Sequence, residues 1–132
     1  MTTPAQYTGI MLSLPYPPSV NQYWRHPSKG PLAGRHLISE AGRKYREAVR
    51  AAVWEEIGTM QRPVFKTERL CIEIMTHAPD ARRRDLDNIL KGLLDGIAFA
   101  GLVADDSQFD SILLYRGETK KPAYVTVTIE AI

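Results

Sequence analysis

The sequence predicts a single domain, residues 1–132, of the α/β (α+β) class. We expect a two-layer sandwich in which both helices cover one face of a mixed sheet. Four short segments alternate apolar and polar residues, as strands do. Two longer segments carry the apolar spacing of amphipathic helices. In chain order these segments predict β-α-β-α-β-β, and the 132 residues contain no internal repeat and no low-complexity tract.

The strand segments share a period of two, which places alternate side chains on opposite faces of a sheet. They are residues 9–14, 70–75, 111–116 and 125–130. Prolines at positions 15, 17 and 18 end the first segment, because proline cannot donate to a ladder of hydrogen bonds. Residues 19–38 show no periodicity and contain two prolines and two glycines. We therefore expect a long loop there, and loops of this length often have a function.

Each helix segment has a recognisable start or end. Ser39 can cap a helix that runs to Ile57, where Gly58 ends it. The expected buried stripe of this helix is Ala41, Tyr45, Ala48, Val49, Ala52 and Val53, with Arg43, Arg46 and Arg50 facing water or DNA. A second helix is expected over residues 86–100, with Gly101 ending it. Its apolar face is Leu86, Ile89, Leu90, Leu93, Leu94, Ile97 and Ala98, and Asp95 is expected to be solvated.

The composition is that expected of a cytoplasmic protein. No run of 18 apolar residues occurs, so we expect no membrane span. The first ten residues, MTTPAQYTGI, lack the charged and apolar regions of a secretory signal. The single cysteine, Cys71, excludes an intrachain disulfide and fits a reducing compartment. Because it lies in a strand pattern, we expect it to be part of the core.

Basic residues are concentrated in two regions, although the formal net charge is only +2. Seven basic residues and two acids lie between Arg25 and Arg50, and residues 82–84 are three consecutive arginines. Such patches are consistent with a polyanionic partner, while solvated ion pairs are the alternative explanation. The residues expected to contact DNA are Asn21, Trp24, Arg25, Lys29, Arg35, Arg43, Arg46, Arg82, Arg83 and Arg84.

Three aromatic residues, Tyr16, Tyr23 and Trp24, lie in or beside the expected loop. Aromatic rings in such a place can stack on unpaired bases or wedge into a base step. They can equally attach the loop to the core. The sequence leaves both interpretations open.

The segment with most chemical content is RRRDLDN, residues 82–88, followed by Lys91. Arginine grips phosphate with a planar fork of donors, and aspartates are oxygen ligands suited to Mg²⁺. If the chain is extended before the second helix, Asp85 and Asp87 point to the same side, and Asp87 shares a helix face with Lys91. A phosphate-binding group of arginines beside a metal-binding pair of aspartates predicts a nuclease.

Asp105 and Asp106 can supply the third carboxylate of such a metal site, although both also suit a simple turn. His26, His36 and His77 show no metal-ligand spacing. No glycine-rich phosphate loop is present, so we expect no nucleotide cofactor. The residues alone therefore predict a Mg²⁺ site, with Mn²⁺ as a possible substitute, in which Asp85 and Asp87 are ligands together with Asp105 or Asp106.

Four stretches carry a family resemblance: LPYPPSVNQYWRH from Leu14, ISEAGRKYR from Ile38, DARRRDLDNILKGLLD from Asp80 and GLVADDSQF from Gly101. Together they resemble the RusA family of Holliday-junction resolvases, common in phages and prophages, over residues 12–129. The resemblance implies a homodimeric, Mg²⁺-dependent endonuclease, bacterial or phage-encoded, that resolves four-way DNA junctions by paired nicks. It places the family's essential acids at Asp85, Asp87 and Asp106 and its essential lysine at Lys91.

Two questions follow from that resemblance. RHPSKGPLAGRH, within the expected loop, departs from the family and bears on sequence preference at the cleaved step. A non-catalytic protein that binds branched DNA is the alternative function, although it predicts the loss of acids that are present here.

The expected helix length also bears on how the metal site is assembled. A helix over residues 86–100 is about 22 Å long, and the six residues beyond it reach back at most about 20 Å. We therefore expect Asp106 to join Asp85 and Asp87 of a second subunit across a two-fold axis. If the helix is shorter, Asp106 could instead reach Asp85 and Asp87 of its own chain.

Overall fold

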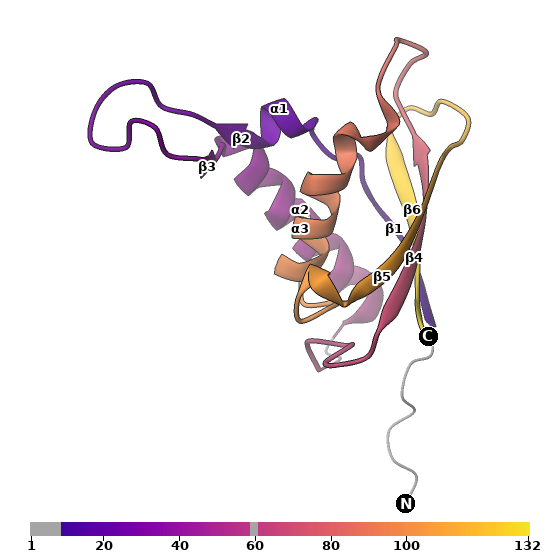
Figure 1. Ribbon diagram of the computed structural model, residues 1–132. Coiled ribbons are helices and arrows are strands. Elements are labelled where there is room, and N and C mark those ends of the chain that lie inside the picture. Colours follow the sequence, from indigo (N-terminus) through magenta and orange to yellow (C-terminus); the bar gives the residue numbers. More distant parts are fainter. Residues whose placement is uncertain (1–8, 59–60) are drawn as a thin grey trace, which may run out of the picture.

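The computed structural model describes residues 9–58 and 61–132, and its architecture confirms the α+β sandwich (Figure 1). Residues 1–8, most of the stretch considered above for a secretory signal, lie outside the described residues. The strands are β1 Gly9–Pro15, β2 Trp24–Arg25, β3 Leu37–Ile38, β4 Leu70–His77, β5 Phe109–Arg116 and β6 Tyr124–Ala131. The α-helices are α1 Val20–Tyr23, α2 Glu40–Ile57 and α3 Leu90–Phe99, and η1 Leu86–Ile89 and η2 Asp106–Gln108 are 3₁₀ turns.

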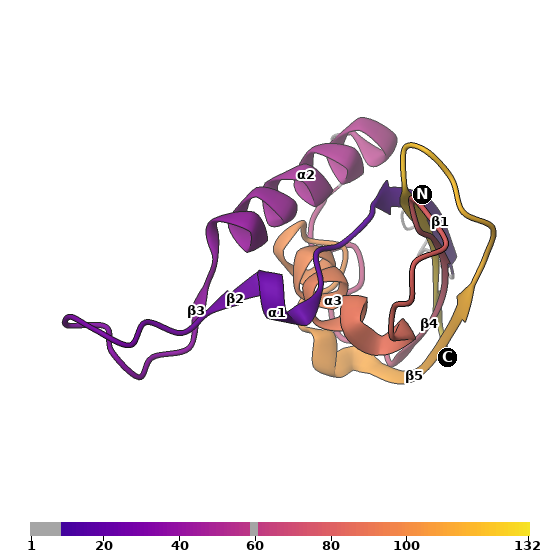
Figure 2. The same cartoon turned by 90° about the horizontal axis from the view of Figure 1, so that it is seen from above.

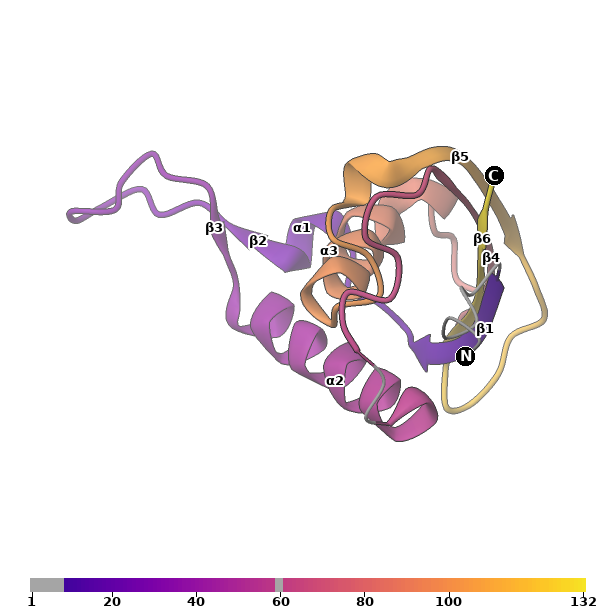
Figure 3. The same cartoon turned by 90° about the horizontal axis from the view of Figure 1, so that it is seen from below.

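The main sheet has the order β1-β6-β4-β5 and is mixed, as predicted. β6 pairs antiparallel with β1 and β4, whereas β4 and β5 are parallel. A parallel pair needs a crossover between its strands, and η1 and α3 supply it. Helices α2 and α3 lie on the same side of this sheet, as Figures 2 and 3 show. Within the described residues, no helix has the length and apolar character needed to cross a bilayer.

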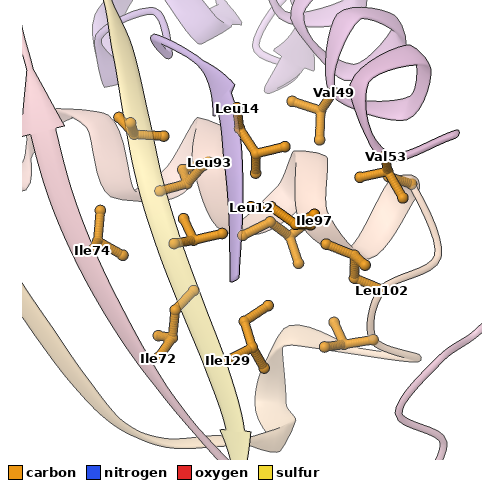
Figure 4. Close-up of a cluster of buried hydrophobic side chains, with 14 of the residues drawn as sticks. Leu12, Leu14, Val49, Val53, Ile72, Ile74, Leu93, Ile97, Leu102 and Ile129 are labelled. Atoms are coloured by element: carbon orange, nitrogen blue, oxygen red, sulfur yellow. The ribbon is translucent and has the colours of Figure 1, made fainter. Parts of the chain in front are cut away.

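The core lies between the sheet and these two helices (Figure 4). Alternate residues of the strands point into it because a strand has a period of two. The helices contribute residues from the faces that they turn toward the sheet. Nearly fully buried members are Leu12 and Leu14 of β1, Ile72 and Ile74 of β4, Ile129 of β6, Val49 and Val53 of α2, and Leu93 and Ile97 of α3.

The same alternation corrects the expectation for Cys71. Leu70 and Ile72 are buried in the core, so Cys71 between them lies on the opposite face of β4, where it is half-buried. The prediction that it belongs to the core was therefore wrong.

Helix α2 begins and ends as predicted, but its buried stripe is different. The side chain of Ser39 accepts a hydrogen bond from Gly42 N, and Gly58 has a φ of 71° after the last turn. The buried residues are Gly42, Tyr45, Val49 and Val53, whereas Ala41 and Ala48 are exposed and Ala52 is half-buried. Compared with the prediction, the buried face of α2 is therefore shifted toward Gly42, because α1 packs against the helix at that residue.

The predicted helix over residues 86–100 is divided into two parts. Residues 86–89 form η1, and the α-helix proper covers residues 90–99. Asp85 precedes η1 with extended backbone, as predicted, at φ −74° and ψ 132°. Gly101 ends the segment with a φ of 84°, a value that favours glycine.

Residues 19–38 are not one long loop, which corrects the sequence-based expectation. Ser19 and Gln22 form a capping box around α1, and Trp24 then pairs with Ile38 in the two-stranded ribbon of β2 and β3. Residues 26–36, here called the arm, extend away from the rest of the molecule (Figures 1 and 2). The short polar helix and two-residue strands are below the length at which periodicity is visible in sequence.

Tyr23 attaches this region to the two long helices. Its side chain is fully buried, and its hydroxyl donates a hydrogen bond to Asp95 of α3. Burial, and then this hydrogen bond, raise the pKa of Tyr23. Nε of Arg46 lies 3.5 Å from Oδ2 of Asp95, an ion pair without hydrogen-bond geometry. The predictions that Asp95 is solvated and that Arg46 faces away from the core were wrong, since both side chains are only 26% exposed.

We predict that Tyr23→Phe lowers the free energy of unfolding by roughly 1.5–3 kcal/mol, because it removes a hydrogen bond to a half-buried carboxylate. Tyr115→Phe is the matched control, since its hydroxyl donates to Glu73 at 2.7 Å in an exposed pair. The control should change stability by less than about 0.5 kcal/mol. Urea denaturation followed by circular dichroism measures both values. Equal effects would contradict an anchoring role for Tyr23.

Candidate functional site

The first part of the candidate site lies where the chain leaves β4 and enters η1. Asp85 occupies the N-cap position of η1 without a capping hydrogen bond from its side chain, Asp87 lies in the first turn, and both side chains are exposed. In the described part of the chain, no hydrogen bond or ion pair engages either carboxylate. Each is therefore open to a ligand from outside the chain.

A neighbouring aspartate, Asp80, has the opposite role. Its carboxylate lies 2.8 Å from Nη1 of Arg84 and 3.2 Å from Nη2 of Arg82. The hydrogen bond from Arg84, followed by those from Arg82, holds the pKa of Asp80 well below its usual range. Of the three predicted arginines, only Arg83 is exposed with no ion pair to another described residue. Asp80 thus orients the segment by holding both arginines.

The arginines border an open cleft of about 660 Å³. Other residues that line it are Tyr16 and Ser19 before α1, Gln22 within α1, and Asp85 and Asn88 at η1. Arg116, the last residue of β5, donates a hydrogen bond of 2.8 Å to the carbonyl oxygen of Arg84. This contact fixes the position of Asp85 near the carboxyl end of β5.

Lys91 lies on the first turn of α3 and is exposed. Its Nζ stands 5.6 Å from the centroid of the Trp24 ring. Although Asp87 precedes it by four residues, the two side chains form no ion pair. Residues 86–89 wind with about three residues per turn, so the α-helical spacing does not apply there. No described carboxylate therefore offsets the charge of Lys91.

The two adjacent aspartates at η2, Asp105 and Asp106, differ in their contacts. Asp105 caps η2, where its carboxylate accepts a hydrogen bond from Ser107 N at 3.0 Å. Hydrogen bonds from Ser107 also lower the pKa of Asp105. Asp106 is half-buried, and no described residue engages its carboxylate. The turn interpretation thus fits Asp105, while Asp106 remains available for chemistry.

Gln108 fixes η2 and was missed at the level of sequence. Its side chain is buried, accepts from Ala104 N at 2.8 Å and donates to the carbonyl of Glu68 at 3.0 Å. The sequence did contain a signal, because Asp105 and Gln108 have the spacing of a capping box and the structure forms that box. Gln108 is a positioning residue for the turn that presents Asp106.

The parallel pairing of β4 and β5 places the two parts of the site at opposite ends of β5. Phe109 at the start of β5 lies beside Leu70 at the start of β4, and Arg116 lies beside Thr76. Asp106 comes three residues before Phe109, whereas Asp85 follows the segment held by Arg116. Among the residues that the structure describes, no three acidic, histidine or cysteine side chains form a group able to hold a metal. One chain therefore does not unite the three predicted ligands.

The other predicted DNA-contacting residues lie on α1, the ribbon, the arm and α2. Asn21, Arg25, Lys29, Arg35 and Arg43 are exposed. Trp24 is half-buried beneath Lys91. Arg46 differs from the prediction, because its guanidinium lies over the ring of Phe99 at 4.4 Å and beside Asp95.

Known proteins resemble this chain over most of its length. The family described as Endodeoxyribonuclease RusA matches residues 15–130. The crossover junction endodeoxyribonuclease rusA of Enterobacteria phage HK97 is 45% identical over 104 residues, which cover 79% of each chain. The crossover junction endodeoxyribonucleases RusA of Shigella sonnei (strain Ss046) and Escherichia coli (strain K12) are 36% and 35% identical over 121 residues, 89% of this chain and 91% of each relative. This chain therefore belongs to the RusA family of endodeoxyribonucleases.

Proposed function

We propose that this protein is a Mg²⁺-dependent endonuclease that acts as a homodimer and resolves four-way DNA junctions by paired symmetric nicks. One observation carries the proposal. Four of the seven aspartates, Asp80, Asp95, Asp105 and Asp110, are engaged by partners within the fold. The other three are Asp85, Asp87 and Asp106, which are the predicted ligands, and no described residue engages them.

These residues fit a divalent cation. Carboxylate oxygens are the ligands that Mg²⁺ prefers, and Mg²⁺ commonly takes only a few of them because it keeps several waters. Mn²⁺ has similar ligand preferences and is the expected substitute. When bound, such an ion supplies a water of lowered pKa and neutralises charge on the phosphate. A protein that only binds branched DNA would have no use for exposed carboxylates beside a polyanion.

Lys91 and the arginines supply the positive charge in this proposal. The ammonium of Lys91 stabilises the charge that develops on the scissile phosphate. Arg83 contacts the DNA backbone, and backbone contacts position the duplex without reading its sequence. The relatives come from phages and enterobacteria. We accordingly place the activity in the bacterial cytoplasm.

We also propose that each active site contains Asp85 and Asp87 of one subunit and Asp106 of the other. The eight residues of β5 span about 26 Å, and the aspartates lie near its opposite ends. The chain after α3 does not fold back, because the carbonyls of Gly101 and Leu102 accept hydrogen bonds of 3.0 Å from Val64 and Phe65. A two-fold axis that sets two subunits antiparallel brings the missing carboxylate to each pair.

Adjacent aspartates provide the test of catalysis. On a synthetic four-way junction with Mg²⁺, Asp106→Asn should abolish nicking while Asp105→Asn retains it, because asparagine also caps a helix. Asp85→Asn and Asp87→Asn should likewise abolish nicking and bind the junction as well as or better than the wild type, since repulsion from DNA falls. Replacing Mg²⁺ by EDTA should stop cleavage. Cleavage by Asp85→Asn at the wild-type rate would refute the assignment.

Mixing two inactive proteins tests the shared site. A heterodimer of Asp85→Asn and Asp106→Asn subunits carries one site with both changes and one with neither, so nicking of one strand should return. Sites built from single chains would all stay inactive in the same mixture. Subunit exchange is verified by native mass spectrometry, and an inactive mixture that has exchanged its subunits excludes the shared arrangement.

Salt dependence tests the contact assigned to Arg83. Junction affinity measured in EDTA should fall steeply with salt, and Arg83→Ala should reduce the slope of log affinity against log salt by about 0.9, one phosphate contact. Arg69→Ala is the matched control, because that exposed arginine is paired with Asp110. It should leave the slope unchanged. Equal slopes for wild type and Arg83→Ala would show that Arg83 is only solvated.

A further inference from the structure

We propose that Trp24 is a positioning residue for Lys91, which it holds at the active site without neutralising its charge. This inference rests on the catalytic role proposed above for Lys91. Its basis is the contact in which Nζ of Lys91 stands 5.6 Å from the centroid of the Trp24 ring. No ion pair joins Lys91 to any described carboxylate.

The group that contacts a lysine determines whether the positive charge of the lysine is offset. Lys44 lies 3.4 Å from Glu40, and Lys120 lies 3.5 Å from Glu118, so a carboxylate offsets each of these charges. An indole attracts an ammonium through its quadrupole and carries no net charge. A lysine held in this way is oriented but remains a full cation. That state is the one needed to meet a phosphate whose negative charge increases during cleavage.

The Trp24 ring is itself fixed from two directions. Its neighbour Tyr23 meets it edge-on, with centroids 5.2 Å apart and planes at 86°. The ring of His36, which belongs to the arm, lies 4.1 Å away. The backbone of Trp24 pairs with Ile38 in the ribbon. The indole is therefore a fixed platform.

Tyr23 also sets the distance between that platform and α3. A methyl group added at Gly92 would lie 3.2 Å from Cδ1 of Tyr23, and one added at Gly42 would lie 2.6 Å from its carbonyl oxygen. Both helices can approach the tyrosine closely because these two positions lack side chains. Since Gly92 directly follows Lys91, this close contact brings the base of Lys91 to the platform.

The platform role differs from base stacking in what it predicts. A stacking residue contributes to DNA affinity, whereas a positioning residue contributes to the cleavage rate once DNA is bound. Substituting Trp24 therefore separates the two roles. Trp24→Leu removes the aromatic face, and Trp24→Phe retains a smaller one.

Trp54→Leu is the matched control. This indole is 56% exposed and has Arg62 above its ring at 5.0 Å, near the end of α2. It offers the same kind of contact at a place to which we assign no catalytic role. Loss of an exposed cation–π contact there should leave cleavage unchanged.

Three measurements test the proposal: the single-turnover nicking rate at saturating protein, junction affinity in EDTA, and the NMR shifts of the Lys91 ε-methylene group. Trp24→Leu should lower the rate about tenfold and leave affinity within about twofold, because Trp24 is not a stacking residue. It should also move the ε-methylene signals downfield, toward those of a free lysine, as the ring current is lost. Trp24→Phe should restore most of the rate.

Each other outcome has a defined meaning. Unchanged Lys91 signals in Trp24→Leu, or an unchanged rate where Lys91→Ala is inactive, would overturn the proposal. Weakened affinity with an unchanged rate would overturn it in favour of base stacking. Wild-type cleavage by Lys91→Ala would refute the catalytic role of Lys91 instead, and the NMR shifts would still decide whether the indole holds this side chain. If Trp24→Leu is unfolded, the ε-methylene shifts of Lys91 in Trp24→Phe decide: the smaller ring should move them part of the way downfield, and unchanged shifts would overturn the proposal.

Discussion

The parallel pairing of β4 and β5 is the constraint on which the arrangement of the site depends. Two parallel neighbours force the chain to return along the length of the sheet between them, and α3 makes that return. The residues directly before α3 therefore lie toward one end of the sheet, and those directly after it lie toward the other. The RRRDLDN segment and the DDSQ segment, close in sequence, are separated for this reason.

The sequence was sufficient for most elements because their signals are local. Alternation located four of the strands to within a few residues, and Ser39 and Gly58 marked α2 correctly. The candidate acids were selected because carboxylates beside arginines are chemically distinctive, and the family resemblance supported the same choice. The contacts of Asp95 and Arg46 were not predictable. Asp95 accepts a hydrogen bond from Tyr23, which is distant in sequence, and Arg46 of α2 packs over Phe99 of α3. No local sequence pattern predicts contacts between such distant residues.

The contrast among the aspartates also depends on tertiary structure. Asp105 and Asp106 are the same residue type at adjacent positions, yet the fold uses only the first, as a cap. Asp80 and Asp85 likewise differ in whether arginines reach them. From the sequence alone, these aspartates are equally good candidates for metal ligands, because their side chains are identical. A structure distinguishes those whose charge is already compensated by a neighbour from those whose charge is available to a ligand.

The distance between the two ends of α3 also affects regulation. In the shared arrangement proposed above, a lone chain holds two incomplete halves of a catalytic centre, and a newly synthesised subunit would not cleave the genome around it. While subunits are scarce, the population of complete centres rises with the square of their concentration. The proposed division of ligands, which follows from the direction of a single strand, would thus delay DNA cleavage until the concentration of subunits is high.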